Sequence, residues 1–276
     1  MISVKVSNFL AKEWEVAIIL DACRYDSFKS LYRDYLAGGR LEKCIGASCT
    51  PHWLRSVFPH EYSDIVYVSG NPWINSSTPW NGFDPRGKFK EIYDVWNWAW
   101  DEELKTVPPS EVSKVALKAS REHSGERLVV HYLQPHYPYL GIRLPKEVKM
   151  DFEGVDGRGD SKGPFLKLYK FLGQELEKLL GSPRVWRFRD SLKAKPNHIE
   201  EYLWRTYTPE HLRSLYEDNL QRVLDEVQKL LDHLRGKIVV TSDHGEAFGE
   251  YGEFFHPIGT TNPVVRQVPC WENEFL

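Results

Sequence analysis

The chain has 276 residues, of which 41% are hydrophobic and 27% are charged, a composition that is typical of a soluble globular protein with a sizeable core. A formal net charge of −3 gives no long-range attraction to nucleic acid or to an anionic membrane, so neither is expected as a partner. The N-terminal residues lack the features of a signal peptide and no stretch has the apolar length of a membrane span, so no integral membrane segment is expected.

The four cysteines are Cys23, Cys44, Cys49 and Cys270, and no two of them form a Cys-x-x-Cys pair. Their spacing is typical neither of a disulfide framework nor of a zinc knuckle. Free thiols persist in a reducing compartment, so we expect a cytoplasmic protein.

Four apolar segments have the length and composition of buried strands. In chain order they span residues 14–20, 64–70, 127–133 and 236–242.

Segments with helical periodicity lie between these strands. Residues 109–123 form one predicted helix with Ser110 as its N-cap, and residues 165–180 form another. Residues 208–236 have the strongest pattern, with Thr208 as N-cap, Pro209 in the first turn and Gly236 after the helix end.

Strands that alternate with helices predict the α/β class, as a three-layer α/β/α sandwich with a mostly parallel central sheet. Residues 1–276 contain no internal repeat and no linker, so one domain is expected. Two irregular excursions are predicted, near residues 71–106 and 141–163. Long loops of this kind often form the lids or walls of a binding site.

Polar side chains follow three of the predicted strands. Asp21 follows the first, His136 follows the third, and Asp243 and His244 follow the last. Ligands of open α/β sheets bind outside the carboxyl ends of the strands, so these side chains are expected at one edge. Two carboxylates there would repel each other unless a cation neutralised them, and this set of oxygens and nitrogens suits zinc, manganese or magnesium. The simpler interpretation of each residue is a turn residue or a helix cap.

A hydroxyl at the start of a short predicted helix is the candidate nucleophile. In "GASCTPHWLRSVFP", residues 46–59, Thr50 is the expected N-cap, Pro51 the first helical residue and Pro59 the stop. Free N–H groups and the helix dipole stabilise an oxyanion at this position, and a metal ion would lower the pKa of the hydroxyl. The alternative is that Thr50 only caps the helix.

The segments "VAIILDACRYDSF", "ASCTPHWLRS", "HYLQPHYPY", "VVTSDHGEAFGE" and "FFHP" occur in this order between about residue 14 and residue 258. Together they resemble the alkaline phosphatase superfamily, and within it the sulfatase-like branch of arylsulfatases, lipoteichoic acid synthases and phosphoethanolamine transferases. The resemblance implies an alkaline-phosphatase-like fold and a metal-dependent hydrolase or transferase that acts on phosphate or sulfate esters.

The resemblance also implies a role for individual residues. Asp21, Asp243 and His244 match the metal ligands, and the nucleophile at the helix start is a further ligand. His136 matches a histidine that contacts the oxygens of the ester, and His256 in "FFHP" matches one that binds the metal or the leaving group.

Arg24 has two interpretations. It either holds charge on the phosphoryl oxygens or pairs with Asp26 to orient the first loop.

The nucleophile motif departs from that of sulfatases, which convert the cysteine of Cys-x-Pro-x-Arg to formylglycine. Cys49 and Pro51 fit the first half of that motif, but His52 and Trp53 replace the small residue and the arginine. Thr50 resembles the threonine of the lipoteichoic acid synthases and phosphoethanolamine transferases, so Thr50 ranks first, Cys49 second and Ser48 third. The Asp-x-x-x-His pair of two-metal relatives is not found, so the residues support one metal site and leave a second open.

The leading hypothesis is a metal-dependent hydrolase or transferase that acts through Thr50 on phosphate mono- or diesters of small molecules, lipids or sugars. One alternative is a sulfatase with formylglycine derived from Cys49. The other is a metal-binding protein with the same fold and no catalytic activity.

Overall fold

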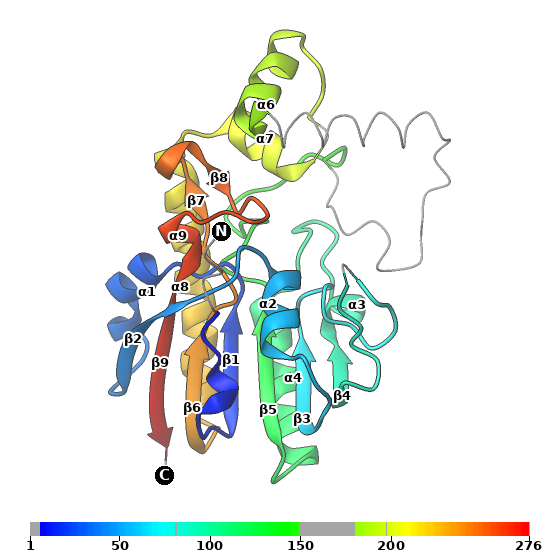
Figure 1. Ribbon diagram of the computed structural model, residues 1–276, viewed down its shortest axis with the longest axis vertical. Coiled ribbons are helices and arrows are strands. Elements are labelled where there is room, and N and C mark those ends of the chain that lie inside the picture. The colour runs from blue at the N-terminus through cyan, green and yellow to red at the C-terminus, as the bar shows by residue number, and fades with distance from the viewer. Residues whose placement is uncertain (1–5, 81, 149–179, 197, 276) are drawn as a thin grey trace.

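A seven-stranded, mostly parallel sheet forms the centre of the fold (Figure 1), and the computed structural model describes residues 6–80, 82–148, 180–196 and 198–275. Across the sheet the strands are β2 (Arg40–Ile45), β9 (Gln267–Phe275), β6 (Gly236–Thr241), β1 (Val16–Leu20), β5 (Arg127–Tyr132), β3 (Tyr62–Ser69) and β4 (Phe89–Asp94). The strand β9 runs antiparallel to both β6 and β2, and the other pairs are parallel.

The four predicted strands are confirmed as β1, β3, β5 and β6. All five residues of β1 are buried because this strand lies between β5 and β6 and is covered on both faces. A strand in that position must be apolar along its whole length, which is why its sequence pattern is clear.

Three strands of the sheet were not predicted, because they lie at or near its edges. The edge strand β2 is partly exposed along its whole length, and in β9 only the first half is buried. The other edge strand, β4, and the helix α3 (Val95–Trp98) lie within residues 71–106. The prediction of an irregular excursion there is therefore wrong for residues 89–98, since an edge strand needs no long apolar run.

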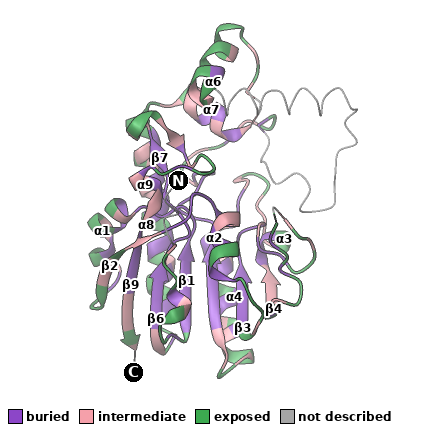
Figure 2. Ribbon diagram, viewed as in Figure 1, coloured by how far each residue is buried: buried purple, intermediate pink, exposed green. Residues whose placement is uncertain are grey.

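Helices cover both faces of the sheet, which confirms the predicted three-layer α/β/α architecture (Figure 2). One core packs α1 (Tyr25–Leu31), α4 (Pro109–Glu122) and α8 (Pro209–Leu231) against the sheet. The opposite core contains α2 (Thr50–Val57) and the 3-10 helix η1 (Phe9–Ala11). Alternate residues of β1 point into the two cores: Ile18 into the first and Ile19 into the second.

A third apolar cluster lies beyond the carboxyl ends of β1, β5 and β6 (Figure 1). It combines the N-terminal part of α8 with the remaining elements at that end of the molecule. These are α6 (Ser182–Ser191), α7 (Ile199–Thr206), β7 (Ala247–Phe248) and β8 (Phe254–Phe255). Two short elements lie at the same end, α9 (Pro263–Arg266) and the 3-10 helix η3 (Glu250–Gly252). A further 3-10 helix, η2 (Tyr32–Asp34), lies elsewhere and directly follows α1. This cluster encloses the strand ends that carry the candidate site.

The predicted helix over residues 165–180 and most of the excursion over 141–163 lie outside the described residues. Within the described ranges, no helix has the combination of length and apolarity that crossing a membrane requires.

The two predicted helix caps have different outcomes. Thr208 is confirmed as the N-cap of α8, where its side chain accepts a hydrogen bond from the His211 N–H. The prediction for Ser110 is wrong, because α4 begins one residue earlier, at Pro109, after Pro108. Proline fits the first position of a helix, where no N–H donor is needed.

Replacing Thr208 with alanine is expected to lower the free energy of unfolding by about 1 kcal/mol, because the His211 N–H loses its acceptor. Ser110→Ala is the matched control, since the Ser110 side chain does not cap α4. Urea unfolding of both variants measures the difference. Equal effects of the two substitutions would contradict the assignment of the caps.

Candidate functional site

The structure brings Asp21, Asp243 and His244 together at the carboxyl ends of two neighbouring strands. The strands β1 and β6 are parallel neighbours in which Ile19 is opposite Thr241, so the residues that follow both strands meet. The His244 Nε2 atom lies 3.5 Å from a carboxylate oxygen of Asp21 and 3.5 Å from one of Asp243. All three side chains are buried. Residues separated by more than two hundred positions thus share one small volume.

Thr50 lies at the same point, at the start of α2. Its Oγ1 atom is 3.4 Å from His244 Nε2, which in turn lies 3.5 Å from a carboxylate oxygen of Asp243. Cys49, rather than Thr50, is the N-cap residue, so Thr50 is the first residue of the helix. The approach of α2 depends on Gly46, where an added Cβ would lie only 2.7 Å from the Asp243 carbonyl oxygen.

The other two nucleophile candidates bond elsewhere. The Cys49 thiol bonds to the backbone of His52 and to the Ser48 side chain, and burial raises its pKa. The Ser48 hydroxyl lies 3.0 Å from His52 Nδ1 and accepts a hydrogen bond from the Gly259 N–H. Among the three candidates, Thr50 is therefore the one whose hydroxyl lies 3.4 Å from His244, the histidine that contacts both carboxylates.

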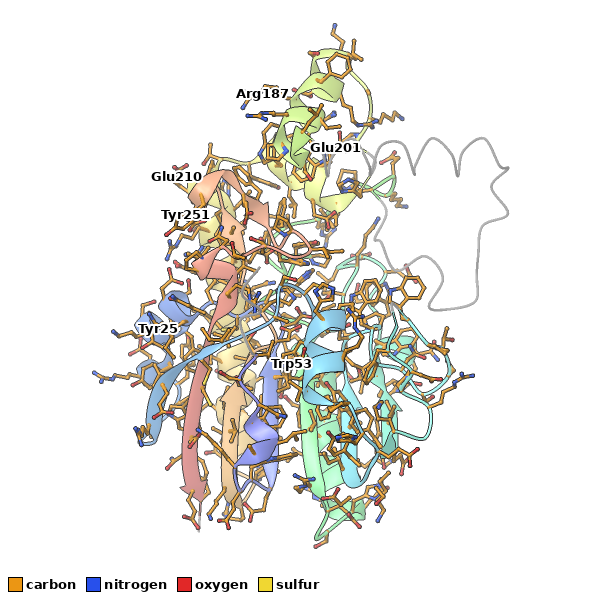
Figure 3. All side chains as sticks on the ribbon, in the orientation of Figure 1. Tyr25, Trp53, Arg187, Glu201, Glu210 and Tyr251 are labelled. Atoms are coloured by element: carbon orange, nitrogen blue, oxygen red, sulfur yellow. The ribbon has the colours of Figure 1, made fainter. Side chains whose placement is uncertain are left out.

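His131 belongs to this group and was missed in the sequence. It lies on β5 opposite Ile19 of β1, and its Nε2 atom is 3.8 Å from an oxygen of Asp21. The Tyr67 hydroxyl bonds to its Nδ1 atom at 2.8 Å, which turns Nε2 toward the carboxylates. The indole of Trp53 (Figure 3) packs against the His131 ring with centroids 6.0 Å apart. The available signal was a histidine in the interior of the otherwise largely apolar stretch "LVVHYL".

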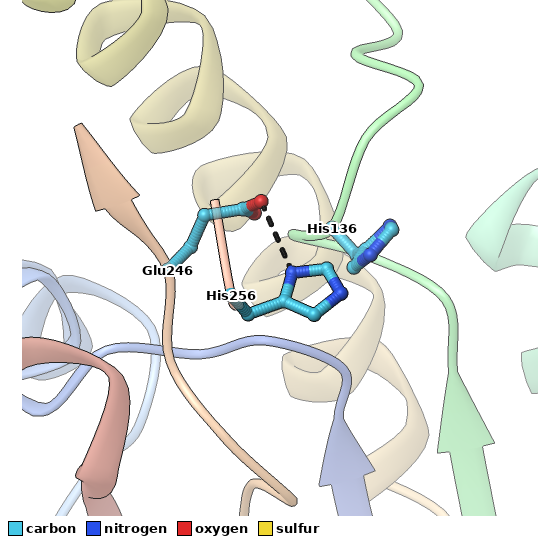
Figure 4. A group of neighbouring side chains, drawn as sticks. All are labelled: His136, Glu246 and His256. Atoms are coloured by element: carbon cyan, nitrogen blue, oxygen red, sulfur yellow. Dashed lines mark ion pairs between the residues drawn. The ribbon is translucent and has the colours of Figure 1, made fainter. Parts of the chain in front are cut away.

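A second group of ligand-type side chains consists of His136, Glu246 and His256 (Figure 4). One ligand atom from each lies within 4.8 Å of the others, as is also true of Asp21, His131 and Asp243. The His256 Nδ1 atom is 3.5 Å from a Glu246 oxygen. The sequence analysis expected a second site to carry an Asp-x-x-x-His pair, so the role of Glu246 in this group was missed.

The two groups adjoin each other through His244. Its ring centroid is 4.4 Å from that of His256 and 6.3 Å from that of His136. The candidate site therefore contains two ligand sets side by side, rather than the one set that the sequence supported.

Several buried atoms in both groups have no hydrogen-bond partner among the described residues. They are Asp21 Oδ1, His131 Nε2, Asp243 Oδ2, both carboxylate oxygens of Glu246 and His256 Nδ1. Unpaired buried carboxylates are strongly destabilising. Carboxylate oxygens and imidazole nitrogens converging in this way fit divalent cations, zinc above all.

The protonation states reflect this crowding. Burial, together with the charges of Asp243 and Glu246, raises the pKa of Asp21 well above its usual value. Burial raises the pKa of Glu246 to about 7 and lowers the pKa of both His131 and His136 to about 4. Without a cation, the pocket thus favours the neutral forms of these four side chains, whereas the pKa of Asp243 is lowered by the nearby histidines despite its burial.

Arg24 does not point its charge at the site. Its guanidinium makes two hydrogen bonds to Asp26, one to Glu250 and one to the backbone carbonyl of Glu246. These bonds favour the interpretation in which Arg24 orients the first loop through Asp26. Arg24 also ties that loop to the segment that carries Glu246.

Comparison with family models and with curated proteins finds no match to this chain. Solved structures share its fold. Lipooligosaccharide phosphoethanolamine transferase A from Neisseria meningitidis, an integral membrane protein, matches with a TM-score of 0.54 and 12% identity, over 94% of this chain and 47% of that one. The chain thus spans about half the length of that transferase.

Two other structures are similar. The C-terminal periplasmic domain of a phosphoethanolamine transferase from Escherichia coli, in complex with zinc, matches at a TM-score of 0.49 and 11% identity, over 94% of this chain and 72% of that one. An alkaline phosphatase superfamily protein from Vibrio parahaemolyticus matches at a TM-score of 0.47 and 10% identity, over 96% of this chain and 60% of that one. Sequence identities this low give information about the fold alone. The fold that the resemblance implied is confirmed.

The pKa of Glu246 leads to a prediction for the metal-free protein. The unfolded chain releases this proton near the usual value of 4.5 and the folded chain near 7, so folding stability is lost as the pH rises between these values. Glu246→Gln removes that loss. In the presence of a chelator, the variant is expected to be more stable than the wild type by about 3 kcal/mol near pH 8, and about equally stable near pH 4.

Urea unfolding across this pH range measures the difference, with Glu111→Gln on the surface of α4 as the control. If the free energies of unfolding of the Glu246 variant and the wild type changed with pH in parallel, the pKa of Glu246 would not be raised by burial.

Proposed function

The chain has the fold of the alkaline phosphatase superfamily, and we propose that it is a metal-dependent hydrolase or transferase that acts on phosphate esters through Thr50. The observation that carries the proposal is the position of the Thr50 hydroxyl, 3.4 Å from His244 Nε2 and beside the buried carboxylates of Asp21 and Asp243 that contact the same nitrogen. A hydroxyl at a helix start, beside a ligand set for a divalent ion, is the arrangement that nucleophilic catalysis requires.

Two cations fit the ligand sets. Asp21, Asp243, His244 and Thr50 would hold the first, with His131 as an additional ligand. His136, Glu246 and His256 would hold the second. Mixed carboxylate and imidazole ligands favour zinc or manganese over magnesium, which prefers oxygen ligands. The bound ions would neutralise charge on the phosphoryl oxygens and lower the pKa of the Thr50 hydroxyl.

The protein's own groups carry the remaining steps. His244 contacts the Thr50 hydroxyl, and the N–H groups at the start of α2 stabilise charge on the phosphoryl oxygens. Thr50 Oγ1 forms a bond to phosphorus as the bond from phosphorus to the leaving oxygen breaks, which gives a phosphothreonine. Water or an acceptor alcohol then attacks phosphorus and releases Thr50.

His256 has two mutually exclusive roles: it is a ligand of the second cation or, where it holds no cation, the proton donor to the leaving group. Its side chain is 19% exposed, whereas that of Glu246 is fully buried, so His256 is the more accessible of this pair. An imidazole in contact with solvent can deliver a proton to a departing oxygen. The substrate is a phosphate mono- or diester of a small molecule, a lipid or a sugar.

The two alternatives have less support. A sulfatase requires modified Cys49 beside the ligand sets, but the Cys49 thiol bonds to Ser48 and to the His52 backbone. A metal-binding protein without activity does not account for the contact between Thr50 and His244. The cytoplasmic location that the free thiols suggest remains a prediction.

Replacing Thr50 with alanine is expected to reduce hydrolysis of p-nitrophenyl phosphate and bis-p-nitrophenyl phosphate roughly a thousand-fold or more, with the fold retained. Ser48→Ala and Cys49→Ala are the matched controls and are expected to keep most of the activity. Circular dichroism verifies folding. Full activity of the Thr50 variant would refute the nucleophile assignment, and formylglycine in the Cys49 peptide, detected by mass spectrometry, would favour the sulfatase.

The ligand sets make a second prediction, which needs no substrate. Asp243→Asn is expected to lose most of the bound metal, as measured by elemental analysis.

Tyr67→Phe is expected to weaken zinc binding about 10- to 100-fold, because His131 loses the hydroxyl that orients it. Competition with a chromogenic chelator measures this affinity. Tyr62→Phe on the same strand is the control, since the Tyr62 hydroxyl bonds to the Val57 carbonyl, and equal affinities of the two tyrosine variants would remove His131 from the ligand set.

A further inference from the structure

Two cysteines are close neighbours on the strands β2 and β9, outside the ligand sets. In this antiparallel pair Cys44 is opposite Val268 and Cys270 is opposite Glu42. Cys44 and Cys270 are thus diagonal neighbours on one face of the sheet. Both residues line one small cavity, the Cys270 thiol donates a hydrogen bond to Glu272, and both are free thiols. The sequence analysis treated all four cysteines as unrelated because 225 residues separate these two.

The surroundings of the pair favour reaction at Cys44. Cys44 is partly exposed, whereas the other three cysteines are buried. A small cavity of about 40 Å³ is lined by both thiols together with Ser7 and Lys12. The neighbouring Cys270 thiol, the Ser7 side chain and the Lys12 ammonium lower the pKa of Cys44 to about 7. A thiolate that is both accessible and stabilised in this way is the reactive form of cysteine.

The remaining cysteines lack these features. Burial raises the pKa of Cys23 and of Cys49. The pKa of Cys270 is raised by the neighbouring Cys44 thiol and by burial. Cys270 is therefore the protonated partner of the pair, positioned to react second.

We propose that Cys44 and Cys270 form a thiol-modification site that reacts with low-molecular-weight disulfides of the glutathione type. The Cys44 thiolate attacks one sulfur of the external disulfide, whose S–S bond breaks, so one thiolate leaves and a mixed disulfide remains on Cys44. Cys270 then loses its proton to solvent and attacks the Cys44 sulfur, which releases the second thiol. Two protein thiols are oxidised to one disulfide, and the external disulfide is reduced to two thiols.

The bond would join elements that carry the candidate site. Cys270 of β9 is opposite Thr241 of β6, two residues before Asp243. Cys44 of β2 precedes the loop that leads to Thr50. The cavity beside the two thiols also reaches Ser242. The pair is thus placed between the two chain segments that hold Asp243 and Thr50, although the proposal stands independently of the function assigned to them.

Peptide mapping of the full-length wild-type protein tests the proposal directly. The reduced protein is incubated with oxidised glutathione, the remaining thiols are alkylated, and the digest is analysed without reduction. The expected product is a peptide pair cross-linked between Cys44 and Cys270, with Cys23 and Cys49 alkylated, and dithiothreitol restores all four thiols. A glutathione adduct that persists on Cys44 without the cross-link, or first reaction at Cys23 or Cys49, would overturn the proposal.

Serine variants separate the two steps. Cys270→Ser is expected to stop at one glutathione on Cys44, which intact mass measures as a single adduct, and Cys44→Ser is expected to remain unmodified. Cys23→Ser is the matched control and is expected to form the same cross-link as the wild type. An adduct on Cys270 in the Cys44 variant would contradict the assigned order, and the wild-type peptide map remains decisive if a variant fails to fold.

Discussion

The burial of Asp21 and Asp243 side by side is the constraint on which the rest of the site depends. The strands β1 and β6 are parallel neighbours, so the side chains that follow them are forced into the same space. Two carboxylates removed from water repel each other, and hydrogen bonds alone do not offset the loss of hydration. The Asn71 amide bonds to Asp21, yet Asp21 Oδ1 and Asp243 Oδ2 have no hydrogen-bond partner among the described residues. A divalent cation would resolve this conflict, with the neighbouring histidines as its further ligands.

The elements around the carboxylates serve to orient them and their neighbours. Tyr67 fixes the ring of His131, and Gly46 lets the chain before α2 approach the Asp243 backbone. Arg24 lies outside both ligand sets, and its guanidinium ties the loop after β1 to the backbone of Glu246. These contacts come from separate strands and loops, so several elements of the fold orient the side chains of the site. Such preorganisation is what catalysis by positioned charges requires.

The parts of the fold that the sequence predicted share a physical property. Central strands must be apolar throughout, and β1, β3, β5 and β6 produce that pattern. The long helix α8 has a cap, an early proline and a regular apolar face, so its start at Thr208 could be predicted to the residue. Edge strands face solvent and pair on one side, so β2 and β4 lack a comparable pattern. The cap at Ser110 failed because two consecutive prolines allow the helix to begin earlier than the polar residue suggests.

By itself the sequence determined that Asp21, Asp243 and His244 follow buried strands, and that a hydroxyl stands at the start of a short helix. These are local properties, because each depends on a few consecutive residues. Only the tertiary structure decided that Thr50, rather than Cys49 or Ser48, places its hydroxyl against His244. It also decided that Glu246 joins two histidines in a second ligand set. Such choices depend on side-chain direction and on contacts between distant segments, which packing sets and which no local pattern of residues records.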